Sequence, residues 1–363
     1  MDKKRTTRNK KGSRRTVKDI LESHPVRASA PCRIDMGGTL DISTFYYPLR
    51  HLSPLTVNMA VNLRTVVRIF PYDPGIVKIS SKGFQSDEYP LEEVPFHHPL
   101  GLMFAIAAYF GIEGVHIDIA SSSPPRSALG GSSAAAVALI AAFSRMLWEM
   151  GQPSISRRQT ALIGHYLEAS VAGVPCGLQD QLAAAFGGVN AWCWPGDCLG
   201  PMFRKKALVK KNDLNRLERH LLLAYCGVPH ESKNVNGKWV EQFLSGKYHG
   251  HWAEIVVYTQ KFATALRAGN IKGACLAMNK EVDVRKEMTS EVFDEMGDAL
   301  VASARGNHCS ARFTGAGGGG CIWALGKVED IDRLKGHWES ILSKRKDAGI
   351  LDLKIDSQGL LYE

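Results

Sequence analysis

The stretch PPRSALGGSSA, residues 124–134, decides the fold of this chain. It joins a segment with strand-like alternation, VHIDIA (115–120), to an apolar segment with helical composition, residues 133–149. Gly130 and Gly131 carry no Cβ, so other groups can come close to the backbone. The helix start adds unpaired N–H groups and the positive end of a dipole. The stretch therefore predicts a phosphate-binding turn, with an ordinary serine-capped helix as the simpler alternative.

The loop has neither the Gly-Lys-Ser/Thr of a Walker A motif nor a dinucleotide-binding fingerprint. Ser132 and Ser133 stand at the predicted start of the helix. A hydroxyl in that place can contact a phosphate group or Mg²⁺.

Two acidic residues flank a tight turn further along the chain. Glu168 belongs to a predicted helix over residues 156–172, and Asp180 stands at the N-terminal edge of another, residues 180–186. A carboxylate in the place of Asp180 can accept the proton of an incoming hydroxyl, and Glu168 can reach a cation. A helix cap and a solvated helix face are the simpler alternatives for the two residues.

Arg33 and Asp41 belong to another polar segment, APCRIDMGGTLD (30–41). Arg33 lies on a predicted strand that leads into a glycine turn. Its permanent charge can neutralise a phosphate or lower the pKa of a nearby hydroxyl. Asp41 follows the turn, and its two acceptor oxygens suit paired sugar hydroxyls unless it is a simple turn residue.

A second glycine-rich loop, FTGAGGGGC, spans residues 313–321. It has five glycines in the six positions from Gly315, a density that is costly in chain entropy. We therefore expect its backbone to pass very close to a ligand or to the other glycine loop.

The remaining patterns predict an α+β chain in two parts without a repeat of fixed period. We expect a disordered basic tail over residues 1–25, an N-terminal domain over 26–205 and a C-terminal domain over 206–363. The other expected strands are 63–70, 76–81, 220–227, 351–356 and the two that flank the loop within 311–325. The other expected helices are 99–111, 236–245, 251–268, 270–288, 291–305 and 328–345.

Most of the formal net charge of +9 on the 363 residues belongs to one end of the chain. Residues 1–18 hold nine Lys and Arg and one acid, so the remainder is near neutral. A segment with so few apolar residues cannot offset its ordering entropy by burial. It could touch RNA, a membrane surface or an acidic partner, or have no specific partner. We expect no nucleic-acid function beyond a non-specific contact by this segment.

The composition, 45% hydrophobic and 22% charged, is that of a soluble globular protein. No apolar stretch follows the basic start as in a signal peptide, and the longest apolar run, 134–143, is shorter than the roughly 20 residues that span a bilayer. The eight cysteines include no C-x-x-C pair, so we expect reduced thiols and no structural zinc. These features indicate a cytoplasmic protein with no membrane partner.

Three motifs in a fixed order resemble those of the GHMP kinase superfamily, whose founding members phosphorylate galactose, homoserine, mevalonate and phosphomevalonate. The first, A-P-x-R, consists of Ala30, Pro31 and Arg33; the second, P-P-x-x-x-L-G-x-S-S-A, is 124–134; the third, T-G-A-G-G-G-G, is 314–320. The resemblance implies a two-domain α+β fold. Its N-terminal ATP-binding domain would contain a left-handed βαβ crossover, against the usual handedness, and its C-terminal domain would be ferredoxin-like.

The resemblance also implies in-line phosphoryl transfer with ATP and Mg²⁺ as cofactors. Asp180 is expected to be the catalytic base and Arg33 its cationic partner. Ser132 and Glu168 are expected to bind Mg²⁺. The residues expected to hold the ATP phosphates are Leu129, Gly130, Gly131, Ser132, Ser133 and Ala134. The residues expected on the acceptor side are Gly38, Thr39, Asp41, Gly317 and Gly318.

Residues 177–190, GLQDQLAAAFGGVN, resemble most the D-glycero-D-manno-heptose 7-phosphate kinases and next the galactokinases. Kinases of the mevalonate type have one residue fewer between the glycine turn and the aspartate. The resemblance therefore favours a sugar or sugar phosphate as acceptor, phosphorylated at its anomeric hydroxyl. A second phosphate on the acceptor needs its own cations, for which Arg50, Arg64 and Lys233 are candidates, each with a solvated surface charge as the alternative.

The chain departs from the superfamily pattern at several positions. Ala128 stands where Gly is usual, Gly131 where Ser is usual and Arg126 where a small residue is usual. Asp41 follows Arg33 by eight residues instead of nine. The alternative functions are a galactokinase-like kinase of a free sugar and an inactive ligand sensor with the same fold. No motif indicates an oligomeric state.

Overall fold

An eight-stranded sheet forms one part of the protein in the computed structural model, which describes residues 15–362 except 174, 198 and 230–231. The strands run in the order β12-β1-β2-β5-β3-β4, and β6 and β7 continue the sheet beside β2. All neighbours are antiparallel except β3 and β5. The strands are β1 (Val26–Gly37), β2 (Leu55–Pro71), β3 (Ile76–Ser81), β4 (Asp87–Pro90), β5 (Val115–Ser121), β6 (Val189–Cys193), β7 (Arg204–Ala207) and β12 (Leu361–Tyr362).

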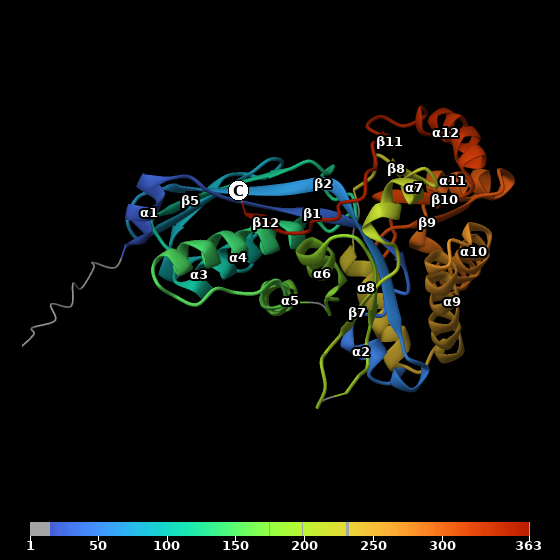
Figure 1. Cartoon of the computed structure of the whole chain (residues 1–363), viewed down its shortest axis with the longest axis horizontal. Coiled ribbons are helices and arrows are strands. Elements are labelled where there is room, and N and C mark those ends of the chain that lie inside the picture. The colour runs from blue at the N-terminus through green and yellow to red at the C-terminus, as the bar shows by residue number, and fades with distance from the viewer. Residues whose placement is uncertain (1–14, 174, 198, 230–231, 363) are drawn as a thin grey trace, which may run out of the picture.

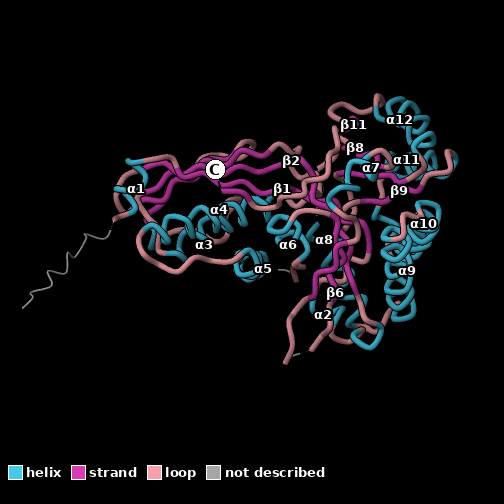
Figure 2. The backbone as a smooth tube through the Cα atoms, viewed as in Figure 1, coloured by secondary structure: helices cyan, strands magenta, loops and turns pink. Residues whose placement is uncertain are grey.

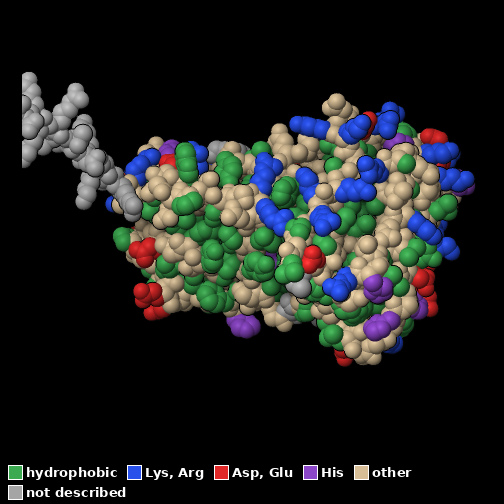
Figure 3. Space-filling model, turned by 60° about the horizontal axis from the view of Figure 1, so that its bottom comes forward, with side chains coloured by type: hydrophobic (Ala, Val, Ile, Leu, Met, Phe, Trp, Pro, Cys, Tyr) green, Lys and Arg blue, Asp and Glu red, His purple; other side chains and the backbone are tan. Residues whose placement is uncertain are grey.

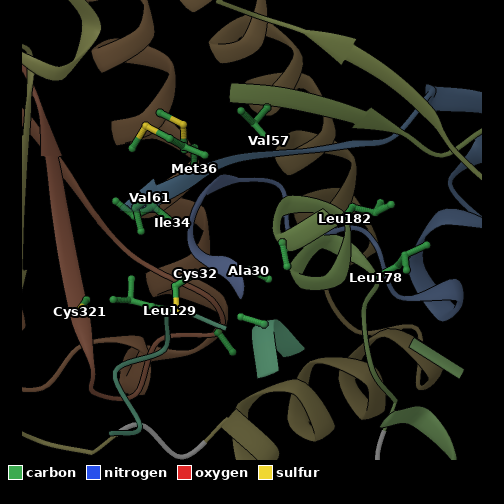
Figure 4. Packing of buried hydrophobic residues seen from close by; sticks show 14 of the residues in the cluster. Ala30, Cys32, Ile34, Met36, Val57, Val61, Leu129, Leu178, Leu182 and Cys321 are labelled. Carbon is green, nitrogen blue, oxygen red and sulfur yellow. The ribbon is translucent and has the colours of Figure 1, made fainter. Parts of the chain in front are cut away.

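Four helices cover one face of this sheet (Figure 1): α3 (Gly101–Phe110), α4 (Gly131–Glu149), α5 (Arg157–Ala172) and α6 (Gln179–Phe186). Helix α4 packs on β1 and β2 and is buried along most of its length, from Ser133 to Ser144 without interruption. It is long and apolar enough to cross a membrane, but 72% of its apolar window is buried inside the fold, as in the core helix of a globular protein. Ala30, Cys32 and Ile34 of β1 contribute to the same buried cluster (Figure 4).

A second sheet and its helices form the other part of the protein (Figures 1 and 2). Its strands are antiparallel in the order β11-β8-β10-β9. They are β8 (Leu221–Tyr225), β9 (Ser310–Phe313), β10 (Cys321–Leu325) and β11 (Gly349–Leu351). The longer helices of this part are α8 (Ser232–Leu244), α9 (His249–Arg267), α10 (Ile271–Met288), α11 (Glu295–Gly306) and α12 (Val328–Leu342). The shorter helices of the chain are α1 (Val17–Ser23), α2 (Ser43–Tyr46), α7 (Leu214–Glu218), η1 (Arg50–Leu52), η2 (Leu91–Glu93), η3 (Lys211–Asp213) and η4 (Ser290–Val292).

The expectation of disorder over residues 1–25 is wrong for residues 17–23, which form α1. Thr16 caps this helix: its side chain accepts from the backbone N–H of Asp19, and the Asp19 side chain accepts in return from the N–H of Thr16. Ile20 is completely buried, so the end of the basic segment has an apolar anchor. Residues 1–14 lie outside the described residues.

The end of the chain returns to the first sheet. β12 pairs with β1, Ile355 forms a bridge with Val61, and Asp356 forms an ion pair with Arg64 of β2. The division of the chain at residues 205 and 206 therefore stays a prediction, and the last strand lies with the N-terminal part. The expected strand at 351–356 is wrong beyond Leu351, where only the bridge at Ile355 continues the pairing.

Candidate active site

The glycine–serine loop runs from the end of β5 to the start of α4. Gly130 is the N-cap of α4, with φ of +72° in the left-handed region that favours glycine, and no side chain caps this helix. The alternative of a serine-capped helix is therefore wrong. The loop is fixed to β1 because the N–H of Arg33 donates to the carbonyl of Leu129 at 2.8 Å. The first turn of α4 thus presents backbone N–H groups that no side chain of its own occupies.

Arg33 and Asp180 form a bidentate ion pair beside this loop. Arg33 Nε donates to Asp180 Oδ1 at 2.7 Å, and a terminal nitrogen of Arg33 donates to Oδ2 at 2.8 Å. Burial works against the guanidinium charge, but Asp180 and then Asp35 hold the pKa of Arg33 above its ordinary value. A Cβ on Gly130 would lie 3.0 Å from Asp180 Oδ2, so the missing side chain lets the carboxylate approach the loop.

Ser133 and Glu168 meet on the other side of the loop. Ser133 Oγ donates to Glu168 Oε2 at 2.8 Å, and the Gln181 amide donates to the same oxygen. Burial and the charge of Asp180 raise the pKa of Glu168 to about 7, while the two hydrogen bonds act in the opposite direction. The expected partner of Glu168 was Ser132, but Ser132 is exposed and it is Ser133 that contacts the carboxylate.

Asp41 is buried in the wall of the same site. The backbone N–H of Gln179 donates to Asp41 Oδ2 at 3.0 Å, and a Cβ on Gly177 would overlap that oxygen at 1.8 Å. Burial raises the pKa of Asp41 to about 7; the Gln179 N–H opposes this, and the charge of Asp180 adds to it. The shortened spacing after Arg33 therefore still brings Asp41 to the site.

The second glycine loop packs against the first. The N–H of Cys321 donates to the carbonyl of Ser127 at 2.9 Å, and a Cβ on Gly320 would lie 2.7 Å from that oxygen. Of the two alternatives for this loop, a close approach to the other glycine loop is therefore confirmed. Gly317 and Gly318 instead lie against Val292, whose carbonyl accepts from the N–H of Gly318 at 3.0 Å.

A cavity of about 680 Å³ brings these groups together. Its wall includes Arg33, Asp180, Ser133, Glu168 and Asp41. The apolar residues of the wall are Phe84, Pro99, Leu100, Leu102, Met103 and Ile119, next to the glycine–serine loop. Of the expected acceptor-side residues, Thr39 and Asp41 line the cavity, whereas Gly38, Gly317 and Gly318 do not.

The unusual residues of the loop adopt strained backbone conformations. Arg126 has φ of +51° and Ala128 has φ of +63°, backbone values that residues other than glycine rarely adopt. Ala128 is buried, and its carbonyl accepts from Arg33 and from Thr314. Arg126 is exposed in the cavity wall, where its charge can reach a phosphate.

Neither Arg50 nor Arg64, two of the cations expected to bind a second phosphate of the acceptor, lines the cavity. Arg64 forms its ion pair with Asp356 and donates to the carbonyls of Ser29 and Gly359, away from the cavity. Arg50 is exposed and does not line the cavity, and the side chain of Lys233 lies outside the described residues. The expectation that Arg64 binds an acceptor phosphate is therefore wrong.

Several residues of the site escaped the sequence patterns. Gln179 and Asn236 line the cavity, and Gln181 holds Glu168. A buried cluster behind the site also joins Asp35 on β1 to Arg312 on β9. Gln179 and Gln181 stand directly on either side of Asp180, the predicted catalytic base. Their place next to it in the sequence was the signal that could have identified them.

The comparisons with known proteins agree with this fold. Residues 98–188, from the start of α3 to the end of α6, match the family described as GHMP kinases N terminal domain. The fold resembles a D-glycero-D-manno-heptose 1-phosphate kinase from Bacteriodes thetaiotaomicron, with a TM-score of 0.69 and 17% identity over 93% of this chain and 98% of that chain. It also resembles Lactococcus lactis galactokinase complexed with galactose, with a TM-score of 0.70 and 16% identity over 94% and 95%. Residues 98–188 thus match a GHMP kinase N-terminal domain, and the chain has the two-domain α+β fold of these solved kinases.

Curated relatives carry a different name within this superfamily. A mevalonate kinase of Pyrococcus horikoshii is 24% identical over 343 residues, which cover 83% of this chain and 88% of the relative. A mevalonate kinase of Pyrococcus abyssi is 25% identical over 340 residues, 84% and 90% of the two chains. The sequence analysis placed kinases of this type behind those of heptose and galactose. The matched family and these relatives support an ATP-dependent kinase of the GHMP type, and they include kinases of both sugars and mevalonate.

Proposed function

We propose that this chain transfers the γ-phosphate of ATP to a hydroxyl of a sugar. The observation that carries the proposal is the bidentate pair of Arg33 and Asp180 in one cavity wall with the start of α4. An acceptor hydroxyl next to Asp180 finds a carboxylate that can take its proton. Arg33 orients this carboxylate through two hydrogen bonds and adds positive charge where phosphoryl transfer develops negative charge.

The glycine–serine loop supports the nucleotide side of the proposal. Its backbone N–H groups and the dipole of α4 favour a bound polyphosphate, and the apolar wall around Phe84 and Met103 suits a nucleobase. Catalysis in such a site depends on positioning and on charge neutralisation rather than on a covalent intermediate.

The oxygen donors of Ser133 and Glu168 fit a Mg²⁺ ion. Among the described residues, the Glu168 carboxyl accepts from the neutral Ser133 hydroxyl and Gln181 amide, and burial together with the charge of Asp180 raises its pKa. The described residues contain no group of three or more His, Cys, Asp and Glu that could hold a metal alone. This agrees with Mg²⁺, which keeps waters and phosphate oxygens as ligands. When bound, Mg²⁺ would neutralise the charge of the phosphate oxygens. We infer that Ser133 and Glu168, not Ser132 and Glu168, hold it.

The charge of the cavity favours a sugar without a second phosphate. Among the described residues of its wall, the cationic ones are Arg33, Lys82 and Arg126. Arg33 forms an ion pair with Asp180. Arg126 belongs to the glycine–serine loop, and Lys82 belongs to the wall near Phe84. Among the described residues, the cavity wall around Asp41 thus offers no free cation for a 7-phosphate or for the carboxylate of mevalonate. Residues 177–190 still favour a heptose or galactose type of acceptor.

An acceptor screen tests the proposal. ATP consumption should be measured with heptose, heptose 7-phosphate, galactose and mevalonate, and the largest kcat/KM is expected for an unphosphorylated sugar. A clear preference for mevalonate would refute the sugar assignment. Turnover of none of these acceptors would instead favour a ligand sensor, although Arg33, Asp180, Ser133 and Glu168 are all in place.

The substitution Asp180→Asn tests the mechanism. It should lower kcat by about 10²–10⁴ and leave ATP binding nearly unchanged, because an amide cannot accept the proton. The matched control is Asp118→Asn on β5, which removes a partly exposed ion pair with Arg68. The control should keep wild-type turnover. An Asp180→Asn enzyme within a few-fold of wild type would exclude Asp180 as the base.

Figure 3 shows Lys and Arg side chains gathered toward the right of the view, with neutral and acidic side chains among them. The sequence prediction of a nucleic-acid contact was based on the nine Lys and Arg of residues 1–18. Deletion of residues 1–14 should leave kinase turnover unchanged and abolish any binding to RNA.

A further inference from the structure

Gln179 is the first residue of α6 and stands between Asp41 and Asp180 in the cavity wall. Its side chain is only 4% exposed. Its backbone groups are both engaged: the N–H donates to Asp41 Oδ2 at 3.0 Å, and the carbonyl accepts from the Asn58 amide at 2.9 Å. Leu178, the N-cap of α6, and Leu182 within α6 belong to the buried cluster shown in Figure 4. The position of Gln179 is therefore fixed by the fold.

The orientation of its side-chain amide is fixed as well. Nε2 lies 3.4 Å from Asp35 Oδ2 and 3.3 Å from Asp41 Oδ1. Asp35 already accepts from the N–H of Gly37 and from the hydroxyl of Thr39, so it acts as an acceptor. The reverse orientation would turn the amide oxygen of Gln179 toward two carboxyl groups. Nε2 is therefore the group that faces them.

This arrangement leaves Oε1 of Gln179 as a buried acceptor with no hydrogen-bond partner among the described residues. A buried polar atom without a partner is unfavourable, and a ligand that supplies a donor regains that loss on binding. The open space that Gln179 borders is the cavity that also holds Asp41 and Asp180. A donor for Oε1 can therefore enter with the acceptor molecule.

We propose that Gln179 determines acceptor specificity by accepting a hydrogen bond from a hydroxyl next to the one that Asp41 binds. The inference rests on the proposed kinase function and deepens it. Gln179 and Asp41 present neighbouring oxygen acceptors in the wall, Asp180 adds a carboxylate to it, and the buried Asp35 lies behind it. Such a wall recognises a pair of adjacent uncharged hydroxyls and repels a carboxylate or a phosphate at the same place. The acceptor class is a neutral vicinal diol, as in a sugar ring.

The test pairs a change in the protein with a change in the acceptor. The accepted sugar with the largest kcat/KM is compared with its monodeoxy analogues, in which each hydroxyl is removed in turn. The wild-type chain should lose roughly tenfold or more in kcat/KM for the analogue that lacks the hydroxyl read by Gln179. In Gln179→Met this particular penalty should fall to within about twofold, while the penalties at the other hydroxyls stay.

The control is Gln242→Met on α8. Gln242 Oε1 is also buried without a partner among the described residues, but Gln242 does not line the cavity. Its variant should keep the complete wild-type deoxy profile. Gln179→Asn keeps an amide but shortens the side chain by one methylene. If Gln179→Met does not fold cooperatively, Gln179→Asn should show the same fall of the deoxy penalty.

An equal loss of kcat/KM for the parent sugar and every analogue in both Gln179 variants would overturn the inference, because a merely structural role affects all acceptors alike. The inference would also be overturned if none of the deoxy penalties in kcat/KM that the wild type shows became smaller in the Gln179 variants. These outcomes still require turnover of a sugar, whereas the absence of any sugar turnover would refute the proposed function itself.

Discussion

Ser132 and Ser133 are adjacent, but only Ser133 is buried and directed to Glu168. Neighbouring residues of a helix point about 100° apart, so only one of them can face the carboxylate. We expect Ser133→Ala to raise the Mg²⁺ concentration needed for half-maximal turnover, because the metal loses an oxygen ligand. Ser132→Ala should leave this concentration within about twofold of wild type. The reverse pattern in a Mg²⁺ titration would return the metal to Ser132.

Glu168 makes the stability of the chain depend on pH. Burial raises its pKa from the ordinary 4.5 to about 7. Between these values the folded chain keeps a proton that the unfolded chain has released, so stability falls as the pH rises from about 4.5 to 7. In EDTA, Glu168→Gln should therefore melt above wild type at pH 8, with a smaller difference at pH 4.5.

Mg²⁺ distinguishes the metal role of Glu168 from simple relief of burial. Added Mg²⁺ should raise the melting temperature of wild type at pH 8 and leave Glu168→Gln unchanged, since a ligand stabilises only the state that binds it. Glu22→Gln on the exposed face of α1 serves as the control and should follow wild type. A Glu168→Gln variant that melts below wild type at pH 8 would contradict the assigned burial cost.

The sequence predicted the chemistry of the site better than its exact residues. Arg33, Asp41, Glu168 and Asp180, which the sequence motifs singled out, all line one cavity. The resemblance pointed to Ser132 as the Mg²⁺ ligand, whereas it is Ser133 that contacts Glu168, and one residue of shift turns the helix by about 100°. Gln179 adjoins the predicted catalytic aspartate in the sequence, but its contacts with Asp35 and Asp41 depend on the fold and could not be predicted.

At the scale of elements, the two glycine loops depend on each other. Gly320 has φ of +80°, and a Cβ there would lie 2.7 Å from the carbonyl oxygen of Ser127. Gly320→Ala should therefore destabilise the chain by the cost of a left-handed non-glycine residue, roughly 1–2 kcal/mol, plus the cost of separating the loops. It should also raise KM for ATP, because the Ser127 carbonyl belongs to the loop that we propose holds the ATP phosphates.

Gly151 provides the matched comparison for this prediction. Its φ is +89°, but a Cβ there would meet nothing within 4 Å. Gly151→Ala should show the backbone cost alone in urea denaturation, with an unchanged KM for ATP. Equal destabilisation by the two substitutions would mean that the contact between the loops contributes nothing.

The elements themselves were predicted unevenly. Helices α3, α4 and α5 were close to their observed bounds because each has a clear apolar pattern and a stop signal. β2 runs for 17 residues, Leu55–Pro71, where only 63–70 was expected. The first part of this strand is buried on both faces, from Thr56 to Val61, and so lacks the alternation that marks a strand.

At the scale of the whole molecule, the pairing of distant segments is what the sequence could not supply. The return of Ile355 and Asp356 to β2 connects residues nearly 300 positions apart, and no local pattern encodes such a contact. The same holds for the charged cluster that joins Asp35 of the first sheet to Arg312 of the second. Arg312 reads as one more strand residue until its neighbours in space are known.

This cluster supports the last prediction. Glu281 on α10 accepts from Arg312 Nε at 2.8 Å and from Arg285 Nε at 3.2 Å, and all three side chains are at most 3% exposed. Burial alone would raise the pKa of Glu281, but the charges of Arg312 and Arg285 hold it below its ordinary value. Arg312 also donates to the Thr39 hydroxyl at 3.2 Å, and Thr39 lines the cavity.

Glu281→Gln keeps the shape of the side chain and removes its charge, which leaves the two buried guanidinium groups opposed mainly by Asp35. Breaking a buried pair in this way costs roughly 3–5 kcal/mol of unfolding free energy. Asp283 lies on α10 as Glu281 does, and it forms an exposed ion pair with Arg305 of α11. Asp283→Asn removes this pair and should cost at most about 1 kcal/mol of unfolding free energy. Because Thr39 and Asp41 lie on the acceptor side, Glu281→Gln should raise KM for the sugar more than KM for ATP at temperatures where it stays folded. A parallel rise in both constants would show that the cluster stabilises the fold without positioning the acceptor.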